Sequence, residues 1–353
     1  MRGMIDAKEE KIRKPERAKH MKVVVIQSIP ETMDLSREEI LSHWEKLQEI
    51  PGVELEIKFP KPRMTRADYA AYIADADACI GAWVRADWLD EAFLLAHPRL
   101  RYLAVLGHGY EEFDHAIMQK HGVTITNTIY GDVTIAQYAM ALLLDICHGI
   151  GAQSAYAKEG YFREPGARFN KLVVPQIELY QKTMGIVGLG AIGYQMAKMA
   201  AGFGMHIVAY SRHVKVGEKY AFVEQVPTLS ELLRRSDVIS LHCPYTAENA
   251  RMLDAQAFAQ MKNGVILLNT ARGGLIDEAA LLDALNRRKV YAAGLDVLTV
   301  EPPTEQTPLL RSPYTRVTGH IAWLSREARL RDADIAIENF RAYLAGHPQS
   351  VIS

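Results

Sequence analysis

The stretch Gly188-Leu-Gly190-Ala-Ile-Gly193 directly follows an apolar run, Met184–Val187, and precedes a segment with helical spacing. A G-x-G-x-x-G sequence between a strand and a helix is typical of a dinucleotide-binding unit. The first glycine permits a tight turn, the second lets the backbone approach a pyrophosphate, and the third lets the helix pack on the sheet. The helix N-terminus then offers free N–H groups to the phosphates. The stretch therefore predicts a Rossmann-type cofactor site.

The acidic residue that many such sites carry about 20 residues further on is missing. The second strand of this unit, His206–Tyr210, is followed by Ser211-Arg212. An NAD-preferring site usually has Asp or Glu there, which binds the ribose hydroxyl. A hydroxyl and a guanidinium can instead bind a 2′-phosphate, and Lys215 adds positive charge. We therefore predict that NADP is preferred over NAD; the alternative is that Arg212 stacks on adenine.

Short apolar runs alternate with helical segments on both sides of this motif. Continuous apolar strands that alternate with helices predict parallel sheets covered on both faces. We therefore expect an α/β fold with two doubly wound domains. The predicted strands are 22–27, 53–58, 78–82, 100–106 and 124–128 in the first series, and 184–189, 206–210, 238–242, 265–269, 292–297 and 316–319 in the second.

The two series are separated by one predicted helix from Val133 to Lys158 and a loop over 160–176. The wide apolar face of this helix indicates an interdomain or intersubunit element, so we expect a homodimer. A last helix is predicted after Ser325 and ends at Gly346. Residues 1–20 are highly charged and are predicted to be a flexible tail.

The composition excludes several classes of protein. The chain has 353 residues, enough for about two domains, and is 49% hydrophobic and 24% charged, as in ordinary globular proteins. Its net charge of −1 favours neither nucleic acid nor a membrane surface as a partner. Cys79, Cys147 and Cys243 form no CxxC pair, which indicates the reducing cytoplasm. No HxH or HExxH pattern suggests a catalytic metal.

Three further segments carry chemically useful residues at the ends of predicted strands. Arg272 follows the apolar strand 265–269, at the sheet edge where ligands bind in such folds. Its planar guanidinium suits a bidentate interaction with a carboxylate. The other two segments are Gly294-Leu-Asp-Val297, followed by Glu301-Pro302, and Gly319-His320-Ile-Ala-Trp323.

Together these segments resemble the D-isomer-specific 2-hydroxyacid dehydrogenase family. The matching stretches are GLGAIG, NTARGGLIDEAALLDAL, AAGLDVLTVEPP and GHIAWLSREAR, and the resemblance runs from about Met21 to the C-terminus. The last stretch is most similar to the branch of glycerate dehydrogenases and hydroxypyruvate or glyoxylate reductases. The resemblance implies that Arg272, Glu301 and His320 form the active site of an NAD(P)-dependent oxidoreductase. Its partner is then a small 2-keto or 2-hydroxy acid.

The resemblance also implies a homodimer formed through the cofactor domain, and a domain organisation. A flavodoxin-like substrate domain is split into residues 21–124 and 318–353, and a Rossmann cofactor domain, 125–317, is inserted in it. The implied cofactor contacts beyond the glycines are Leu189, Ala191, Ile192, Cys243, Pro244, Thr270, Ala271 and Asp296, although Asp296 could instead be a buried structural acid. The implied substrate contacts are His108, Gly109, Tyr130 and Trp323; His108 could equally be an exposed loop residue, and packing alone could explain the two aromatic side chains.

Elementary chemistry assigns roles to the three implied catalytic residues. His320 suits the proton delivered to a carbonyl oxygen because imidazole titrates near neutral pH. A nearby Glu301 would favour the imidazolium and orient its ring. Arg272 would hold the substrate carboxylate. Many relatives have Pro where this chain has Gly319, which could loosen the His320 loop. The alternative function is a non-enzymatic NAD(H)-sensing corepressor on the same fold, which would show no turnover.

Overall fold

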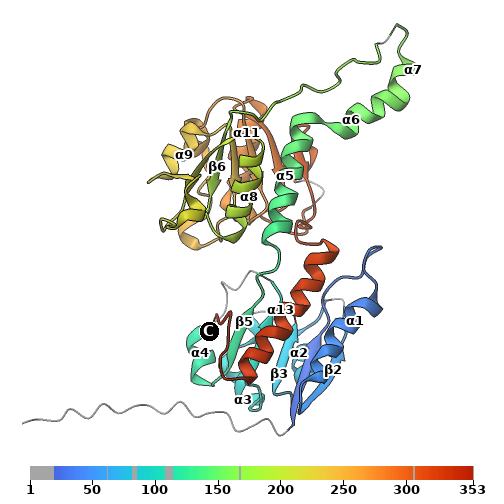
Figure 1. Ribbon diagram of the computed structural model, residues 1–353, viewed down its shortest axis with the longest axis vertical. Coiled ribbons are helices and arrows are strands. Elements are labelled where there is room, and N and C mark those ends of the chain that lie inside the picture. Colours follow the sequence, from blue (N-terminus) through green and yellow to red (C-terminus); the bar gives the residue numbers. More distant parts are fainter. Residues whose placement is uncertain are drawn as a thin grey trace, which may run out of the picture. The chain divides into compact units, whose positions relative to one another are not determined.

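A computed structural model describes residues 20–61, 63–81, 86–107, 114–166, 168–304 and 307–352. The chain divides into two units (Figure 1): unit 1 runs to Tyr130 and resumes at Arg326, and unit 2 comprises Gly131–Ser325. The sequence predicted boundaries after 124 and after 317. The two boundaries between the units lie a few residues later, after Tyr130 and after Ser325. The first shifts because residues 124–127 add a strand to the sheet of unit 1. The second shifts because Thr318, Ile321 and Ala322 are hydrogen-bonded to Asp296 in unit 2. The predicted tail, apart from His20, lies outside the described residues.

Unit 1 is built on a five-stranded parallel sheet in the order β2-β1-β3-β4-β5. This 2-1-3-4-5 order is the flavodoxin-like one. Val23 of β1, the strand next to the β2 edge, pairs with Leu55 on one side and Ala78 on the other. The strands are β1 (Met21–Ile26), β2 (Val53–Lys58), β3 (Ala78–Gly81), β4 (Tyr102–Val105) and β5 (Thr124–Asn127).

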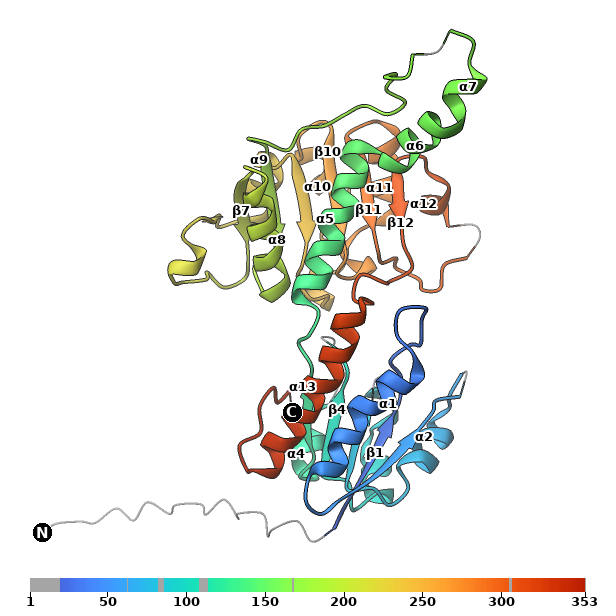
Figure 2. The same cartoon turned by 45° about the vertical axis from the view of Figure 1, so that its right-hand side comes forward.

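Helices cover both faces of this sheet, which explains why its inner strands are continuous apolar runs. One face packs against α2 (Arg66–Ile73), α3 (Glu91–Ala96) and α4 (His115–Lys120). The other packs against α1 (Arg37–Glu45) and α13 (Arg326–Leu344). The C-terminal helix α13 therefore returns to the first sheet and lies beside α1 (Figures 1 and 2). The short 3₁₀ turns are η1 (Lys46–Glu49) and η2 (Ala86–Trp88).

Unit 2 is a seven-stranded parallel sheet in the order β12-β11-β10-β9-β6-β7-β8. The chain starts at β6, proceeds to β7 and β8 on one side, and then returns to build β9 to β12 on the other. The change of direction between β6 and β9 creates the crevice where ligands bind in such sheets. The strands are β6 (Thr183–Val187), β7 (His206–Tyr210), β8 (Glu224–Gln225), β9 (Val238–Leu241), β10 (Val265–Asn269), β11 (Val290–Leu295) and β12 (Thr315–Val317).

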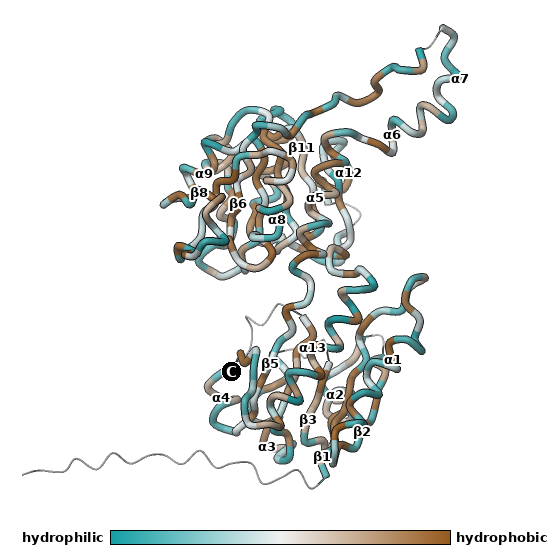
Figure 3. Tube along the Cα trace, in the orientation of Figure 1, coloured by the Kyte–Doolittle hydropathy of each residue, from teal (hydrophilic) through white to brown (hydrophobic). Residues whose placement is uncertain are grey.

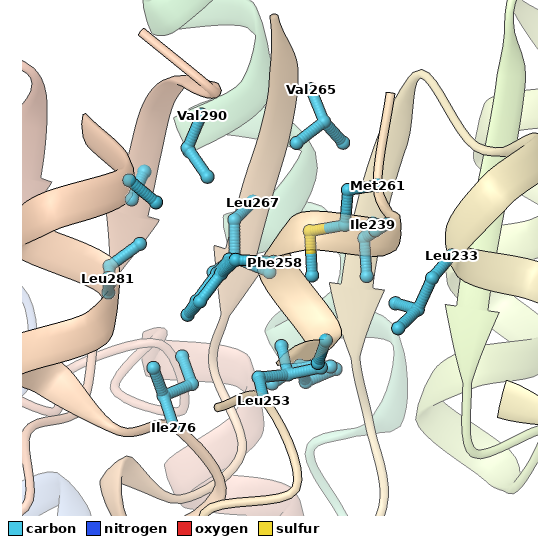
Figure 4. Close-up of a cluster of buried hydrophobic side chains, with 14 of the residues drawn as sticks. Leu233, Ile239, Leu253, Phe258, Met261, Val265, Leu267, Ile276, Leu281 and Val290 are labelled. Carbon is cyan, nitrogen blue, oxygen red and sulfur yellow. The ribbon is translucent and has the colours of Figure 1, made fainter. Parts of the chain in front are cut away.

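Two apolar layers cover this second sheet, and together with unit 1 they confirm the predicted fold class. One layer contains α5 (Asp132–His148) and α8 (Ala191–Gly202). The other contains α9 (Leu229–Arg235), α10 (Ala255–Gln260) and α11 (Glu278–Asn286); Figure 4 shows Phe258 and Leu281 of this layer against Leu267 of β10. The remaining short elements are α12 (Pro308–Arg311), η4 (Glu218–Tyr220), η5 (Ala247–Asn249) and η6 (Gly273–Leu275).

The predicted single helix from Val133 to Lys158 is wrong. It breaks at Gly149, which adopts a left-handed conformation with φ of +51° and whose N–H donates to the carbonyl of Asp145. A Cβ at Gly149 would lie 2.6 Å from Val174 Cγ2, so the break is also a close-packing site. The chain then bends by 50° into α6 (Ile150–Ala155), a π-helical turn η3 (Tyr156–Gly160) and α7 (Tyr161–Arg163), the last of which lies in the predicted loop.

Within the described ranges, no single helix is long and apolar enough to cross a membrane. The bent pair formed by Asp132–His148 and Ile150–Arg163 meets the length and composition criteria only when its two parts are combined.

Candidate active site

The glycine-rich loop connects β6 to α8 in the way that a dinucleotide site requires. Gly188 has φ of +95°, and a Cβ there would lie 2.7 Å from the backbone nitrogen of Cys243. A Cβ at Gly193 would lie 2.1 Å from the carbonyl oxygen of Gly188, so the loop and the helix can pack only with glycine at this position. A Cβ at Gly190 would meet nothing within 4 Å. The open side at Gly190, next to the N-terminus of α8, suits a pyrophosphate.

The residues after β7 differ in what they contact. The hydroxyl of Ser211 accepts a hydrogen bond from the backbone N–H of Leu189, at 2.7 Å. This contact joins the end of β7 to the glycine-rich loop. Arg212 is exposed, and no ion pair links it to another residue in the described ranges. The backbone of Lys215 is paired with the Gln225 side chain through two hydrogen bonds of 2.7 Å.

Buried polar groups line the neighbouring strand ends. The hydroxyl of Thr270, just after β10, is buried and has no hydrogen-bond partner among the described residues. An unpartnered buried hydroxyl is uncommon and suits a ligand group. Burial raises the pKa of the Cys243 thiol to about 11 and lowers the pKa of His242 to about 4, so both are neutral near pH 7. Together with the open side of Gly190, these groups fit a dinucleotide.

The loops after β11 and β12 bring Glu301 and His320 together. Glu301 Oε2 lies 2.7 Å from His320 Nδ1, and Glu301 Oε1 accepts the backbone N–H of Leu298 at 2.8 Å. Because a carboxylate only accepts, Nδ1 carries the proton in this pair. Nε2 makes no hydrogen bond to a described residue. His320 has a left-handed backbone with φ of +58°, a conformation that the surrounding contacts must hold in place.

Asp296 supplies those contacts. Its side chain is 1% exposed, and its Oδ1 accepts hydrogen bonds from the Thr318 hydroxyl at 2.6 Å and the Ile321 N–H at 2.9 Å. Oδ2 accepts the Ala322 N–H at 2.8 Å, and its backbone carbonyl accepts the N–H of His320 at 2.7 Å. These hydrogen bonds make Asp296 the anchor of the His320 loop.

Arg272 stands on a turn that contacts the Glu301 loop. Its Nη1 donates to the carbonyl of Ala271 at 2.9 Å, and within the described part of the chain no carboxylate pairs with it. A Cβ at Gly273 would lie 2.0 Å from the carbonyl carbon of Leu298, so the two loops meet backbone to backbone. Arg272, Glu301 and His320 thus stand on interlocked loops at one edge of the sheet.

The predicted substrate contacts fall in different places. Trp323 lies in unit 2, and its indole N–H donates to the carbonyl of His320 at 2.9 Å. Tyr130 belongs to unit 1 and is 5% exposed. His108 and Gly109 lie outside the described residues. The described residues contain no group of three or more His, Cys, Asp or Glu that could hold a metal ion.

Sequence reasoning missed Asn269, whose side chain makes two hydrogen bonds to the Arg272 turn. It also missed Thr318, which donates to Asp296, and Leu298, which donates to Glu301. Only Asn269 had a signal: Asn at the end of a strand commonly bonds to the backbone two residues on. The other two contacts depend on loops from separate strands.

Comparison with known proteins supports the same conclusion. Residues 140–322 match the family model described as D-isomer specific 2-hydroxyacid dehydrogenase, NAD binding domain. The chain is 40% identical over 260 residues to a hydroxypyruvate reductase of Blautia hydrogenotrophica, covering 72% of this chain and 79% of the relative. It is 37% identical over 278 residues to a D-3-phosphoglycerate dehydrogenase of Mycobacterium tuberculosis, covering 78% of this chain and 51%, about half, of that longer relative.

The solved structures agree on the fold. The TT0316 protein of Thermus thermophilus superposes with a TM-score of 0.79 at 31% identity, over 94% of this chain and all of its own. The glycine-rich loop, the Glu301–His320 pair and the Arg272 turn all lie within residues 140–322, the range that the family model matches. The chain belongs to the D-isomer specific 2-hydroxyacid dehydrogenase family.

Proposed function

We propose that the protein transfers a hydride between NAD(P)H and the 2-carbon of a small 2-keto acid, giving a D-2-hydroxy acid. The observation that carries this proposal is the 2.7 Å contact between His320 Nδ1 and Glu301 Oε2, next to an Arg272 that no described carboxylate neutralises. A proton donor and an open guanidinium are the two groups that a 2-keto acid needs beside a hydride source. The similarity to a hydroxypyruvate reductase supports the same reaction class.

When bound, the nicotinamide cofactor supplies the hydride. His320 holds the proton at Nε2 and gives it to the carbonyl oxygen as that oxygen gains charge. Glu301 accepts from Nδ1 and orients the ring, and its own position is held by the N–H of Leu298. In the reverse direction, the neutral imidazole takes the hydroxyl proton.

Arg272 binds the substrate carboxylate and polarises the adjacent carbonyl. Its guanidinium has several N–H donors, of which one is used by Ala271. A planar fork fixes the orientation of a carboxylate through two parallel bonds, which a lysine cannot do. Orientation of this kind contributes by keeping the reacting carbon near its attack geometry.

A substrate panel tests the reaction. We expect turnover with hydroxypyruvate and glyoxylate, and weaker turnover with pyruvate, when each is supplied with NADH and with NADPH. Absence of turnover on every small 2-keto acid, together with tight binding of the cofactor, would favour the corepressor-like alternative. The matched variant is Glu301→Gln, whose single oxygen can keep the Leu298 bond but whose NH₂ group then faces His320 Nδ1, so we expect it to lower turnover on every substrate of the panel.

We further propose that NADPH is preferred, with Arg212 as the residue that reads the 2′-phosphate. No carboxylate follows β7 to repel the phosphate, and Arg212 is exposed and unpaired among the described residues. The Ser211 hydroxyl accepts the N–H of Leu189, which leaves its own O–H free to donate to the same phosphate. Arg212→Ala should lower kcat/KM for NADPH about tenfold in low salt and leave NADH unchanged. Equal effects on both cofactors would contradict this assignment.

We also propose that the protein forms a homodimer, and the arm formed by α6 and the residues up to Val173 supports this proposal. The arm extends away from the sheet of unit 2 (Figure 2) and includes hydrophobic stretches (Figure 3). Its exposed apolar side chains are Ile150, Phe162, Phe169, Leu172 and Val173. Exposed apolar surface of this kind marks interaction sites. Light scattering should give about twice the 39.5 kDa of one chain, and Phe162→Asp with Phe169→Asp should give the monomer.

The proposed location is the cytoplasm. The three cysteines are free in the structure, as expected for a reducing compartment. Cell fractionation with an antibody to the protein tests this location.

A further inference from the structure

Asn269, the last residue of β10, is a completely buried amide at the base of the candidate site. Its Nδ2 donates to the carbonyl of Arg272 at 2.9 Å, and its Oδ1 accepts the N–H of Ala271 at 3.0 Å. One side chain therefore closes the turn that carries the arginine. Its backbone carbonyl accepts the N–H of Asp296 at 2.9 Å, which links β10 to the strand that carries the anchor of the His320 loop.

These contacts restrict the direction of the arginine. Arg272 Nη1 donates to the backbone carbonyl of Ala271, and the backbone N–H of the same residue donates to Asn269 Oδ1. The guanidinium is therefore bonded to a residue that Asn269 holds in place. In the described residues no carboxylate restrains the rest of the guanidinium. The backbone of the turn is thus the main determinant of where its free donors point.

The turn is also fixed from its other side. Gly273 packs against the backbone of Leu298, whose N–H holds Glu301. A turn that relaxed after loss of the Asn269 bonds would therefore move Arg272 relative to the Glu301–His320 pair. The two hydrogen bonds of Asn269 and the close contact of Gly273 therefore fix the turn that carries Arg272 from its two sides.

We propose that Asn269 is a positioning residue for Arg272: it shapes the turn of residues 269–272 so that the guanidinium is held ready for a substrate carboxylate. This inference rests on the proposed function, because it assigns Arg272 to the substrate. A purely structural role for Asn269 would lower stability without any special dependence on Arg272. The two roles therefore differ in how substitutions at the two positions combine.

The test is a double-mutant cycle measured on the best 2-keto acid with saturating cofactor. Asn269→Leu, which keeps the branched shape of the side chain and removes both bonds, should lower kcat/KM about 30-fold or more in the wild-type background. In the Arg272→Ala background the same substitution should change kcat/KM less than about threefold, because the group it positions is gone. The dissociation constant of NADPH, followed by its fluorescence, should change less than twofold. Equal losses in the two backgrounds would overturn the proposal.

Two further variants keep the test decisive. Asn269→Ser can still accept the Ala271 N–H but cannot reach the Arg272 carbonyl, so we expect an intermediate loss of about three- to tenfold even if the leucine variant does not fold. The control Ser236→Ala removes another completely buried polar contact, a 2.7 Å bond to the carbonyl of Leu232, at the opposite end of the sheet.

Ser236→Ala should lower the melting temperature and leave kcat/KM within twofold of wild type. If it lowers kcat/KM as much as Asn269→Ser does, the effect of Asn269 is general destabilisation and the proposal is wrong. A wild-type protein that reduces none of the 2-keto acids would contradict the proposed function itself. An active wild type whose Asn269 variants keep full activity would contradict the inference alone.

Discussion

Among its described residues each unit buries one acidic side chain, Asp296 in unit 2 and Asp332 in unit 1, and the two differ in how many hydrogen bonds they accept. In unit 2, both oxygens of Asp296 are occupied, by the Thr318 hydroxyl and by two backbone N–H groups. In unit 1, Asp332 of α13 is 2% exposed, and the Thr128 hydroxyl is its one hydrogen-bond donor among the described residues. Burial raises the pKa of Asp332 to about 7.

The difference shows what each carboxyl group does for its unit. The occupied carboxylate of Asp296 holds a strained His320 in place, so its hydrogen bonds serve the chemistry. The poorly solvated carboxyl of Asp332 carries a free-energy penalty whenever it is ionised. The same residue type is therefore expected to support the fold in one unit and to weaken it in the other.

The largest loss of activity should come from removing the imidazole of His320, whose loop Asp296 anchors. His320→Gln removes the proton donor while its backbone can still be held by Asp296. We expect kcat to fall about 10² to 10⁴-fold, the range usual for a general acid, with little change in melting temperature. Steady-state kinetics with a thermal scan measures both. A loss below about tenfold would show that the Asp296 network does not serve His320 catalysis.

Asp296→Asn should have the next largest effect. An amide can accept at one oxygen only, so at least one N–H of Ile321 or Ala322 would face an NH₂ group. Each buried donor left without a partner costs about 1–3 kcal/mol, so we expect a Tm lower by about 2–10 °C and a loss of activity through the displaced His320. Unchanged activity and Tm would mean that the loop does not need the carboxylate.

Asp332→Asn should stabilise the protein above pH 7, whereas Asp296→Asn should destabilise it. Between the pKa of a free aspartate, 3.8, and the folded value of about 7, the native state keeps the proton that the unfolded chain releases. Stability of the wild type therefore falls as pH rises through that window, by up to about 1.4 kcal/mol per pH unit, and does not fall further on this account above pH 7.

The asparagine variant lacks this penalty and can still accept from Thr128. We expect its Tm to exceed that of wild type at pH 8, and the advantage to shrink by about 3 °C or more at pH 5. Calorimetry at both pH values measures it, with Thr128→Val as the control that removes the donor. A Tm advantage that is the same at pH 5 and pH 8 would show that ionisation of Asp332 is not responsible.

The smallest effect is expected at Gly319, just before His320. Its backbone has no positive φ, and a Cβ there would meet nothing within 4 Å. Gly319→Ala should therefore stabilise the protein by about 0.4–1 kcal/mol through the unfolded chain and leave kcat within twofold. A clear loss of kcat would reveal that the His320 loop uses flexibility at Gly319 that the Asp296 network does not restrain.

Much of the fold could be predicted from the sequence because its signals are local. Strands β2, β7 and β10 begin and end where the apolar patterns predicted. The glycines at 188 and 193 could be predicted because a side chain at either position would collide with backbone. The long helix was not predicted correctly, because its apolar face continues past the position where Gly149 turns left-handed and packs against Val174.

By itself, the sequence determined the α/β alternation and the cofactor loop, because these depend on residue type and on spacing along the chain. Its resemblance to a known family pointed to Arg272, Glu301 and His320. Only the tertiary structure decided that Ser211 supports the glycine-rich loop, that Asp296 anchors His320 and that Asn269 closes the Arg272 turn. The Ser211 and Asp296 contacts join loops that follow different strands. The Asn269 contact is local. Its complete burial, however, depends on the position of β10 between β11 and β9 in the sheet.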